Sequence, residues 1–232
     1  MPERLRVEVS PQESTTAIVY PAAAKHRAGV ALILGHGAGA GQTSDFMKSF
    51  AVGLAARGID IATFNFLYTE QGRRLPDPND RLEACWPTVI DAVRARITSD
   101  GDALAIGGKS MGGRIASQVA AAGISGLAGL VFLGYPLHPP GRPDRLRSKH
   151  LSAIRAPMLF VQGSRDPFGS LEELCPITSS FEPAADLYVV EGGDHSFKVR
   201  KGTGVGQEDV YRAIQDHIAA WLREMAAVMK AR

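Results

Sequence analysis

The sequence has few cysteines and no leader-like apolar start. Its 232 residues include two cysteines, Cys85 and Cys175, which lie in unrelated contexts and lack the spacing of metal ligands. This argues against a disulfide framework or a zinc site and favours a reducing compartment, so we expect a cytoplasmic protein. The first ten residues, MPERLRVEVS, alternate polar and apolar side chains. That alternation predicts a strand rather than a signal peptide.

An excess of one charge and long apolar runs are also missing. Lysine and arginine number 26 against 24 acidic residues, so the net charge is only +2. This balance gives no general reason to expect nucleic acid or an anionic membrane as a partner. No run approaches the roughly 18 apolar residues of a membrane-spanning helix. With 45% hydrophobic and 22% charged residues, the composition is that of an ordinary globular chain, and no feature of it indicates an oligomeric state.

What the chain does have is a regular alternation of apolar runs and amphipathic stretches. The runs have strand length and nearly continuous apolar character, as in a sheet buried on both faces: 30–35, 59–66, 103–108, 127–135, 157–163 and 186–193. Helices are expected at 44–57, 80–98, 111–122 and 207–229. The alternation predicts an α/β fold with a mainly parallel sheet and helices on both faces. Two further runs, LRVEV and TAIVY, predict an N-terminal antiparallel pair.

The chain shows no internal repeat and no linker. We therefore expect residues 1–232 to form a single domain, a length that α/β folds often reach as one unit. Two irregular stretches, 67–79 and 136–149, are rich in proline and arginine, and each follows a predicted strand. Both should face the ligand crevice, which in open parallel sheets lies at the carboxyl ends of the strands. Only about 20 residues are available for a lid, which predicts a minimal lid and an open site.

A glycine-rich turn presents a serine between a predicted strand and a predicted helix. Gly108-Lys109-Ser110-Met111-Gly112 fits the pattern G-x-S-x-G. A nucleophile at such a turn has a strained backbone and an exposed hydroxyl, and its neighbours two positions away on each side must be small. Ser110 is therefore the candidate nucleophile. The alternative is a turn that only connects the strand to the helix.

Candidate partners of this serine lie farther along the chain. A serine hydroxyl needs a base that takes its proton and an acid that orients the base. His195 is the best base among six histidines, because it lies in GGDHSF, between the last predicted strand and the terminal helix. Asp166 follows the preceding strand and completes the chain order Ser, Asp, His. Asp194 is adjacent to His195, but adjacent side chains on a loop usually diverge. The alternative for Asp166 is a surface position in the turn RDPFG.

Two backbone N–H groups are candidates for binding the oxyanion of a tetrahedral intermediate. Met111 follows the nucleophile at a helix N-terminus, where donors are free and the helix dipole favours negative charge. The second donor is expected from the glycine-rich loop between Gly35 and Gly41, and we assign it to Ala38. This loop completes neither the P-loop nor the dinucleotide fingerprint, so nucleotide binding is not expected. The chemistry requires no cofactor and no metal.

Four motifs together resemble an α/β hydrolase over nearly the whole chain: HGAGAG, GKSMGGR, GSRDPFG and GGDHSF. The segments running from FNF to GRRLPD and over GYPLHPPGRPDRLRSKHL are similar to the small dienelactone-hydrolase-related group of the KANSL/Tex type. This resemblance implies the α/β-hydrolase fold and the motifs of serine hydrolases, with substrates that are largely undefined. Dienelactone hydrolases proper carry a cysteine at the elbow, where this chain has Ser110, so lactone specificity is not carried over.

These residues predict a serine hydrolase that cleaves a carboxylic ester or thioester through an acyl-enzyme intermediate. Ser110, Asp166 and His195 would form its catalytic triad. A peptidase or amidase with the same machinery is one alternative. The other is a binding or scaffold protein that keeps the hydrolase fold without catalysis, because fold does not imply function.

Basic side chains surround the predicted mouth of the site and suggest a small, anionic acyl substrate. The candidate contacts are Lys109, Arg73, Arg74 and His138. The alternative is that the basic residues pair with acidic residues of the same loops, namely Glu70, Asp77, Asp80 and Asp144. Replacing both arginines by alanine distinguishes the two, because an unchanged preference for charged esters contradicts the anion hypothesis.

Overall fold

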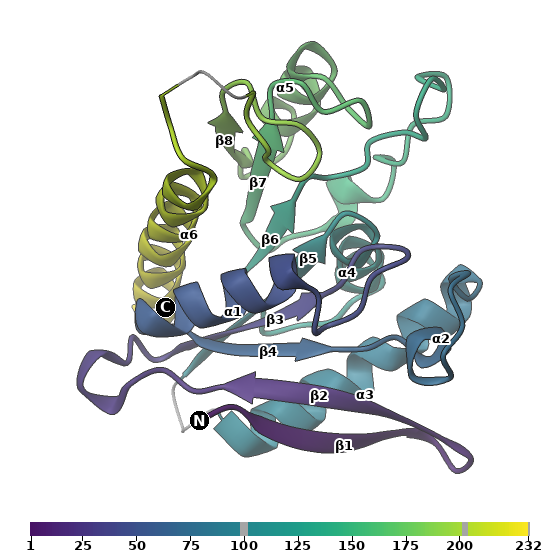
Figure 1. Ribbon diagram of the computed structural model, residues 1–232, viewed down its shortest axis with the longest axis vertical. Coiled ribbons are helices and arrows are strands. Elements are labelled where there is room, and N and C mark those ends of the chain that lie inside the picture. Colours follow the sequence, from purple (N-terminus) through teal and green to yellow (C-terminus); the bar gives the residue numbers. More distant parts are fainter. Residues whose placement is uncertain (98–101, 201–203, 232) are drawn as a thin grey trace.

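The computed structural model, which describes residues 1–97, 102–200 and 204–231, contains one eight-stranded sheet (Figure 1). Its spatial order is β1-β2-β4-β3-β5-β6-β7-β8. The bounds are β1 (Glu3–Ser10), β2 (Glu13–Tyr20), β3 (Val30–Gly35), β4 (Asp60–Phe64), β5 (Ala103–Lys109), β6 (Gly129–Leu133), β7 (Met158–Gly163) and β8 (Asp186–Val190). Neighbours from β4 to β8 are parallel, whereas β1 and β2 are antiparallel. The predicted α/β fold with an N-terminal antiparallel pair is confirmed.

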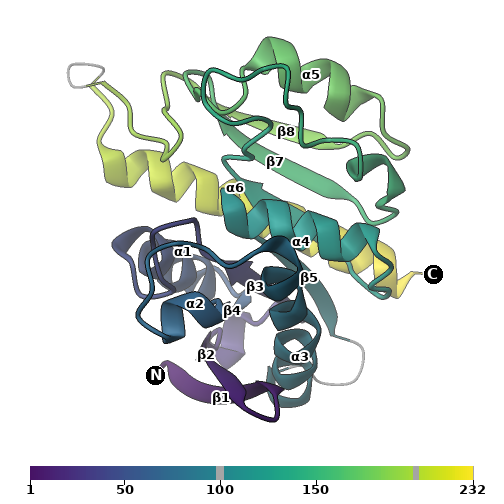
Figure 2. The ribbon, with the colours of Figure 1, turned by 90° about the vertical axis from the view of Figure 1, so that its right-hand side faces the viewer.

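Helices cover both faces of this sheet. They are α1 (Asp45–Ala56), α2 (Leu67–Glu70), α3 (Asn79–Ile97), α4 (Met111–Ala121), α5 (Leu171–Ser179) and α6 (Gln207–Lys230). Figure 2 shows α1 and α3 on opposite sides of the strands. Strand β3 illustrates why: Ile33 packs in the core cluster with α3 and α4, and Leu32 and Leu34 pack in the cluster with α1 and α6. Because successive side chains of a strand point to opposite faces, a strand buried on both must be apolar throughout.

Several predicted boundaries shift where an apolar run continues past the end of its strand. Phe66 and Tyr135 were expected in strands, but both lie beyond the strand ends and are fully buried. Burial in the connecting segments, rather than strand geometry, explains their apolar character. The four predicted helices are present within one or two residues, apart from position 98 of the helix expected at 80–98, which lies outside the described residues.

Two helices were not expected. The segment 67–79 is not irregular throughout, because it begins with α2. Helix α5 starts at a capping box in which the Ser170 hydroxyl accepts from the Glu173 N–H and the Glu173 carboxylate accepts from the Ser170 N–H. Hydrophobic periodicity does not reveal α5, because the helix contains a proline and its apolar stripe is short.

The connection from β6 to Asp166 is short and holds no separate cap. Between β6 and β7 the regular structure is one 3-10 turn, Leu151–Ala153. Over the described ranges, none of the helices combines the length and apolar character needed to cross a bilayer. Because β3, β5, β7 and β8 are parallel, the loops that follow them leave from the same edge of the sheet.

Candidate active site

Ser110 sits in a strained turn between β5 and α4. Its φ of 51° and ψ of −113° are unusual for a residue with a side chain. The turn closes because Gly108 and Gly112 both pack against the backbone of Gly35, where an added Cβ would overlap the Gly35 carbonyl oxygen. The small residues two positions before and after the serine are thus required by the contact with β3. The same geometry presents the hydroxyl at the edge of the sheet.

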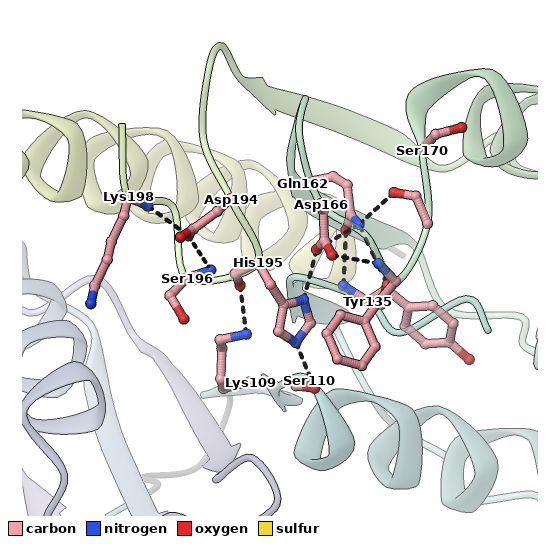
Figure 3. Close-up of polar contacts among 12 residues, drawn as sticks. Lys109, Ser110, Tyr135, Gln162, Asp166, Ser170, Asp194, His195, Ser196 and Lys198 are labelled. Atoms are coloured by element: carbon pink, nitrogen blue, oxygen red, sulfur yellow. Dashed lines mark hydrogen bonds and ion pairs between the residues drawn. The ribbon is translucent and has the colours of Figure 1, made fainter. Parts of the chain in front are cut away.

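The structure brings Ser110, His195 and Asp166 together in one chain of hydrogen bonds (Figure 3). His195 Nδ1 lies 2.7 Å from Asp166 Oδ2, and His195 Nε2 lies 2.8 Å from Ser110 Oγ. A carboxylate only accepts, so in the neutral imidazole Nδ1 carries the proton and Nε2 is free to accept from the serine hydroxyl. This is the arrangement in which an imidazole can remove a hydroxyl proton. Whether the three residues act in catalysis stays a prediction.

Asp166 is held by more than the histidine. Its residue is 4% exposed, and its carboxylate also accepts from Gln162 Nε2 and from the Phe168 N–H, each at 2.9 Å. The Phe168 ring stacks on His195 with a centroid distance of 4.1 Å. Asp194 is turned away, because its carboxylate accepts the N–H groups of the two nearby residues Ser196 and Lys198.

Gln162 is a site residue that the sequence reading missed. It is fully buried near the end of β7, where its Oε1 accepts from the Tyr135 N–H and its Nε2 donates to Asp166 and to the Gly169 carbonyl. Buried polar groups are costly unless they are hydrogen-bonded, so a glutamine inside the apolar run PMLFVQG was the available signal. Gln162 thus donates to Asp166 Oδ2, the same oxygen that faces His195 Nδ1, and helps to hold the carboxylate in place.

The loop after β3 is organised by His36, which is fully buried. Its Nδ1 lies 2.8 Å from the Gly37 carbonyl oxygen, and its Nε2 accepts from the Phe66 N–H at 3.2 Å. The N–H of Ala40 also donates to the Gly37 carbonyl. In a trans peptide the C=O and the following N–H point in opposite directions, so this anchoring turns the Ala38 N–H away from His36. Ala38 lines the cleft next to Ser110.

Burial sets the charge state of His36. Removal from water lowers its pKa to about 4, although the Gly37 carbonyl partly opposes this shift. The ring is therefore neutral at pH 7, as a donor at Nδ1 and an acceptor at Nε2 require.

Met111 begins α4, and the first N–H groups of a helix have no intrahelical acceptor. The N–H groups of Met111 and Ala38 thus remain the candidate oxyanion donors.

A cleft of about 370 Å³ opens beside the serine. Apolar side chains dominate its wall, together with Lys109 and the exposed edge of His195. Its lining consists of Gly37, Ala38, Ala40, Ser44, Phe46, Met47, Lys109, Ser110, Phe168, His195 and Ser196. Such a mainly apolar wall with a few polar groups is typical of small-molecule sites.

Of the four predicted substrate contacts, only Lys109 belongs to this lining. Arg73 and Arg74 are exposed outside it, and Arg73 pairs with Asp77 at 2.6 Å. His138 is buried against Glu173, with its Nε2 3.2 Å from the carboxylate. The structure therefore does not bring these three residues into the cleft.

The acidic residues of the loops pair only in part as the alternative expected. Asp77 forms an ion pair with Arg73, and Asp144 forms one with Arg142 at 2.9 Å. The Glu70 carboxylate instead accepts hydrogen bonds from the Thr16 N–H and from the side-chain amide of Asn65. For metals, no group of three or more histidine, cysteine or acidic side chains in the described ranges is placed to hold an ion.

Known structures share this fold over nearly their whole length. A lidless α/β serine hydrolase from Xanthomonas campestris is 19% identical, with a TM-score of 0.73 over 96% of this chain and 94% of that one. Dienelactone hydrolase from Anabaena variabilis is also 19% identical, with a TM-score of 0.72 and coverages of 96% and 98%. Est1E from Butyrivibrio proteoclasticus, solved with bound ferulic acid, is 12% identical, with a TM-score of 0.72 and coverages of 96% and 99%. At these identities the likeness shows the fold.

Membership of a family comes from the sequence match. A family model described as an alpha/beta hydrolase domain matches residues 28–223, which include the serine turn, both loops that reach it and most of α6. The matched range thus spans every residue of the site described above. The chain belongs to the alpha/beta hydrolase domain family.

Proposed function

We propose that this chain is a serine hydrolase that cleaves a carboxylic ester or thioester through an acyl-enzyme intermediate. The carrying observation is the continuous hydrogen-bonded path from Ser110 Oγ through His195 to Asp166, with distances of 2.8 and 2.7 Å. The serine has a strained backbone at the N-terminus of α4 and lines a cleft of substrate size. These are the parts that nucleophilic acyl transfer needs.

The proposed reaction has two halves. Ser110 Oγ attacks the carbonyl carbon while His195 Nε2 takes its proton, and the N–H groups of Met111 and Ala38 donate to the oxyanion. Asp166 stabilises the resulting imidazolium, which then protonates the leaving oxygen or sulfur as the carbonyl–leaving-group bond breaks. In the second half His195 deprotonates a water that attacks the acyl-serine. The proton returns to Ser110 as the acid leaves.

Relatives and fold support an ester substrate of modest size. Structural neighbours include esterases, and one of them is solved with ferulic acid. The open edge of the sheet and the cleft of about 370 Å³ suit small or extended acyl compounds rather than an enclosed lipid. Among hydrolases of this fold, we assign the chain to the small dienelactone-hydrolase-related group of the KANSL/Tex type on its motifs.

Two broader expectations accompany this proposal. We propose that residues 1–232 work as one domain, an idea supported by the single sheet that all eight strands share. We also propose a cytoplasmic location, since Cys85 and Cys175 are both free thiols, as a reducing compartment requires.

A fluorophosphonate probe tests the proposal directly. Intact mass is measured after incubation of the wild type and of Ser110→Ala, with folding of both checked by circular dichroism. We expect one adduct on the wild type and none on Ser110→Ala, because only an activated serine attacks phosphorus at neutral pH. Esters, thioesters and amides of one acyl group then separate an esterase from a peptidase. A folded wild type without adduct contradicts catalysis and favours a scaffold protein.

A further inference from the structure

Lys109 is a buried cation in the wall of the proposed acyl cleft. It ends β5, directly before Ser110, and only 8% of its surface is exposed. Figure 3 shows its side chain reaching toward the backbone of His195. Long charged side chains are rarely this buried unless they are paired. The mechanism above does not use it.

The protein satisfies this ammonium only in part. Nζ donates to the His195 carbonyl oxygen at 2.7 Å and lies 5.7 Å from the centroid of the Phe46 ring. An ammonium has three N–H donors. Among the described residues no carboxylate forms an ion pair with it, and Asp166 and Asp194 attract it only through space. A desolvated charge therefore lacks a counterion in contact.

A purely structural tie does not require this charge. A neutral donor could hold the His195 carbonyl, and no acidic residue that the structure describes belongs to the cleft wall, where the rings of Phe46 and Phe168 face the same space as Ser110. Burying a cation in such surroundings is costly unless an anion compensates for the lost water. Within the described part of the chain, the cleft lining offers one ammonium and no arginine, whose planar fork recognises phosphate through two hydrogen bonds, so it suits the single charge of a carboxylate.

We propose that Lys109 binds a carboxylate carried by the substrate, so that the preferred substrates are carboxylate-bearing esters or thioesters. This inference rests on the proposed hydrolase function and names its substrate class. The carboxylate completes the ion pair that the chain leaves open and lies beside the nucleophile. It can belong to the acyl chain, as in the half ester of a dicarboxylic acid, or to the leaving group. We expect the acyl chain to carry it.

The test compares charged esters with neutral esters of matched shape. Monomethyl glutarate is paired with methyl 5-methylhexanoate for the acyl side, and 4-acetoxybenzoate is paired with 4-isopropylphenyl acetate for the leaving group. Hydrolysis is monitored at pH 7 by titrating the released acid with base. The wild type should favour monomethyl glutarate over its neutral partner, and the leaving-group pair should show no such preference. A preference only for 4-acetoxybenzoate moves the carboxylate to the leaving group and keeps the role of Lys109.

Variants assign the preference to the lysine. Lys109→Gln keeps an amide donor for the His195 carbonyl but removes the charge. It should lower the charged-to-neutral ratio of kcat/KM by about 10- to 100-fold, the value of a charge-assisted hydrogen bond, mainly through KM. Lys198→Met is the matched control, because Lys198 is exposed on the loop that carries His195 and its side chain points away from the serine in Figure 3. The control should keep the wild-type ratio.

Other results overturn the inference without touching the proposed function. Equal loss on charged and neutral esters in Lys109→Gln makes Lys109 only a positioning residue for His195. The inference is also contradicted if the wild type hydrolyses the neutral esters and prefers neither charged ester to its neutral partner. Calorimetric titration of glutarate provides a readout without turnover: we expect binding to Ser110→Ala and its loss in Ser110→Ala with Lys109→Gln. Absence of glutarate binding to Ser110→Ala overturns the carboxylate site, whereas absence of a phosphonate adduct overturns the hydrolase.

Discussion

The loops after β3 and β8 each bring a histidine to the same edge of the sheet, and the two imidazoles behave differently. In both rings Nδ1 faces an oxygen, the Gly37 carbonyl for His36 and the Asp166 carboxylate for His195. His36 is fully buried and its pKa falls to about 4, whereas the His195 side chain is 19% exposed and reaches the cleft. A carboxylate carries a full negative charge that can stabilise an imidazolium, whereas the Gly37 carbonyl only partly offsets the cost of burying the charged ring. One histidine is therefore a fixed structural element and the other is suited to carry protons.

The largest break in this comparison removes the charge beside His195. Asp166→Asn should lower kcat by about 10⁴-fold, because an amide no longer fixes the Nδ1–H tautomer or stabilises the imidazolium. Ester hydrolysis at pH 7 measures this. Asp194→Asn is the matched control, since an amide oxygen can still accept from the Ser196 and Lys198 N–H groups. Similar losses in both variants contradict the assignment of Asp166.

Replacing the buried histidine should cost less. His36→Phe removes the donor to the Gly37 carbonyl and leaves the Phe66 N–H without its acceptor. We expect kcat to fall roughly 10- to 100-fold through misplacement of the Ala38 N–H, with no change in the pH of half-maximal rate. Thr69→Val is the control, because it removes only the weaker 3.3 Å contact to the same ring. A shifted pH profile in His36→Phe places proton transfer at His36 instead.

His36 should also make stability depend on pH. Its folded pKa of about 4 lies below the ordinary value of 6.5, so the unfolded chain binds the proton more readily between these values. The stabilising preference for the neutral ring is complete above pH 6.5 and is lost as the pH falls toward 4, by about 3 kcal/mol. Urea unfolding of the wild type and of His36→Phe between pH 4 and 7 measures the difference. Parallel curves contradict a buried neutral imidazole.

The smallest effect concerns Lys109, beside the His195 loop. Burial lowers the pKa of its ammonium to about 8, against the attraction of Asp166 and Asp194. The cation is present below this pH and lost above it, so the preference for monomethyl glutarate should decline about tenfold between pH 7 and 9. The effects of His195, Asp166 and Asp194 on the chemical step are common to both esters and cancel in the ratio. If the charged-to-neutral ratio of kcat/KM stays constant over this pH range, Lys109 does not bind the carboxylate.

Local patterns were sufficient for most of the framework. Continuous apolar runs marked the strands because each strand is covered on both faces. The glycines around Ser110 marked the turn because a Cβ at Gly108 or Gly112 cannot fit against β3. Helix α5 escaped because its start depends on a capping box and its interior contains a proline. The hydrogen bonds of two buried polar side chains could not be predicted: those of Gln162 with Asp166, and those of His36 with Gly37 and Phe66.

The sequence by itself determined the order of the strands and of the four longest helices, and the position of a serine at a turn that only small neighbours allow. Those properties depend on residues close together in the chain. Tertiary structure alone decided which predicted contacts reach the cleft, which buried side chain holds the Asp166 carboxylate and which lysine becomes buried. Arg73 is drawn to Asp77, whereas Lys109 is desolvated beside Ser110. Burial and partnership arise from the packing of distant segments, and they set the charge and the reach of each side chain.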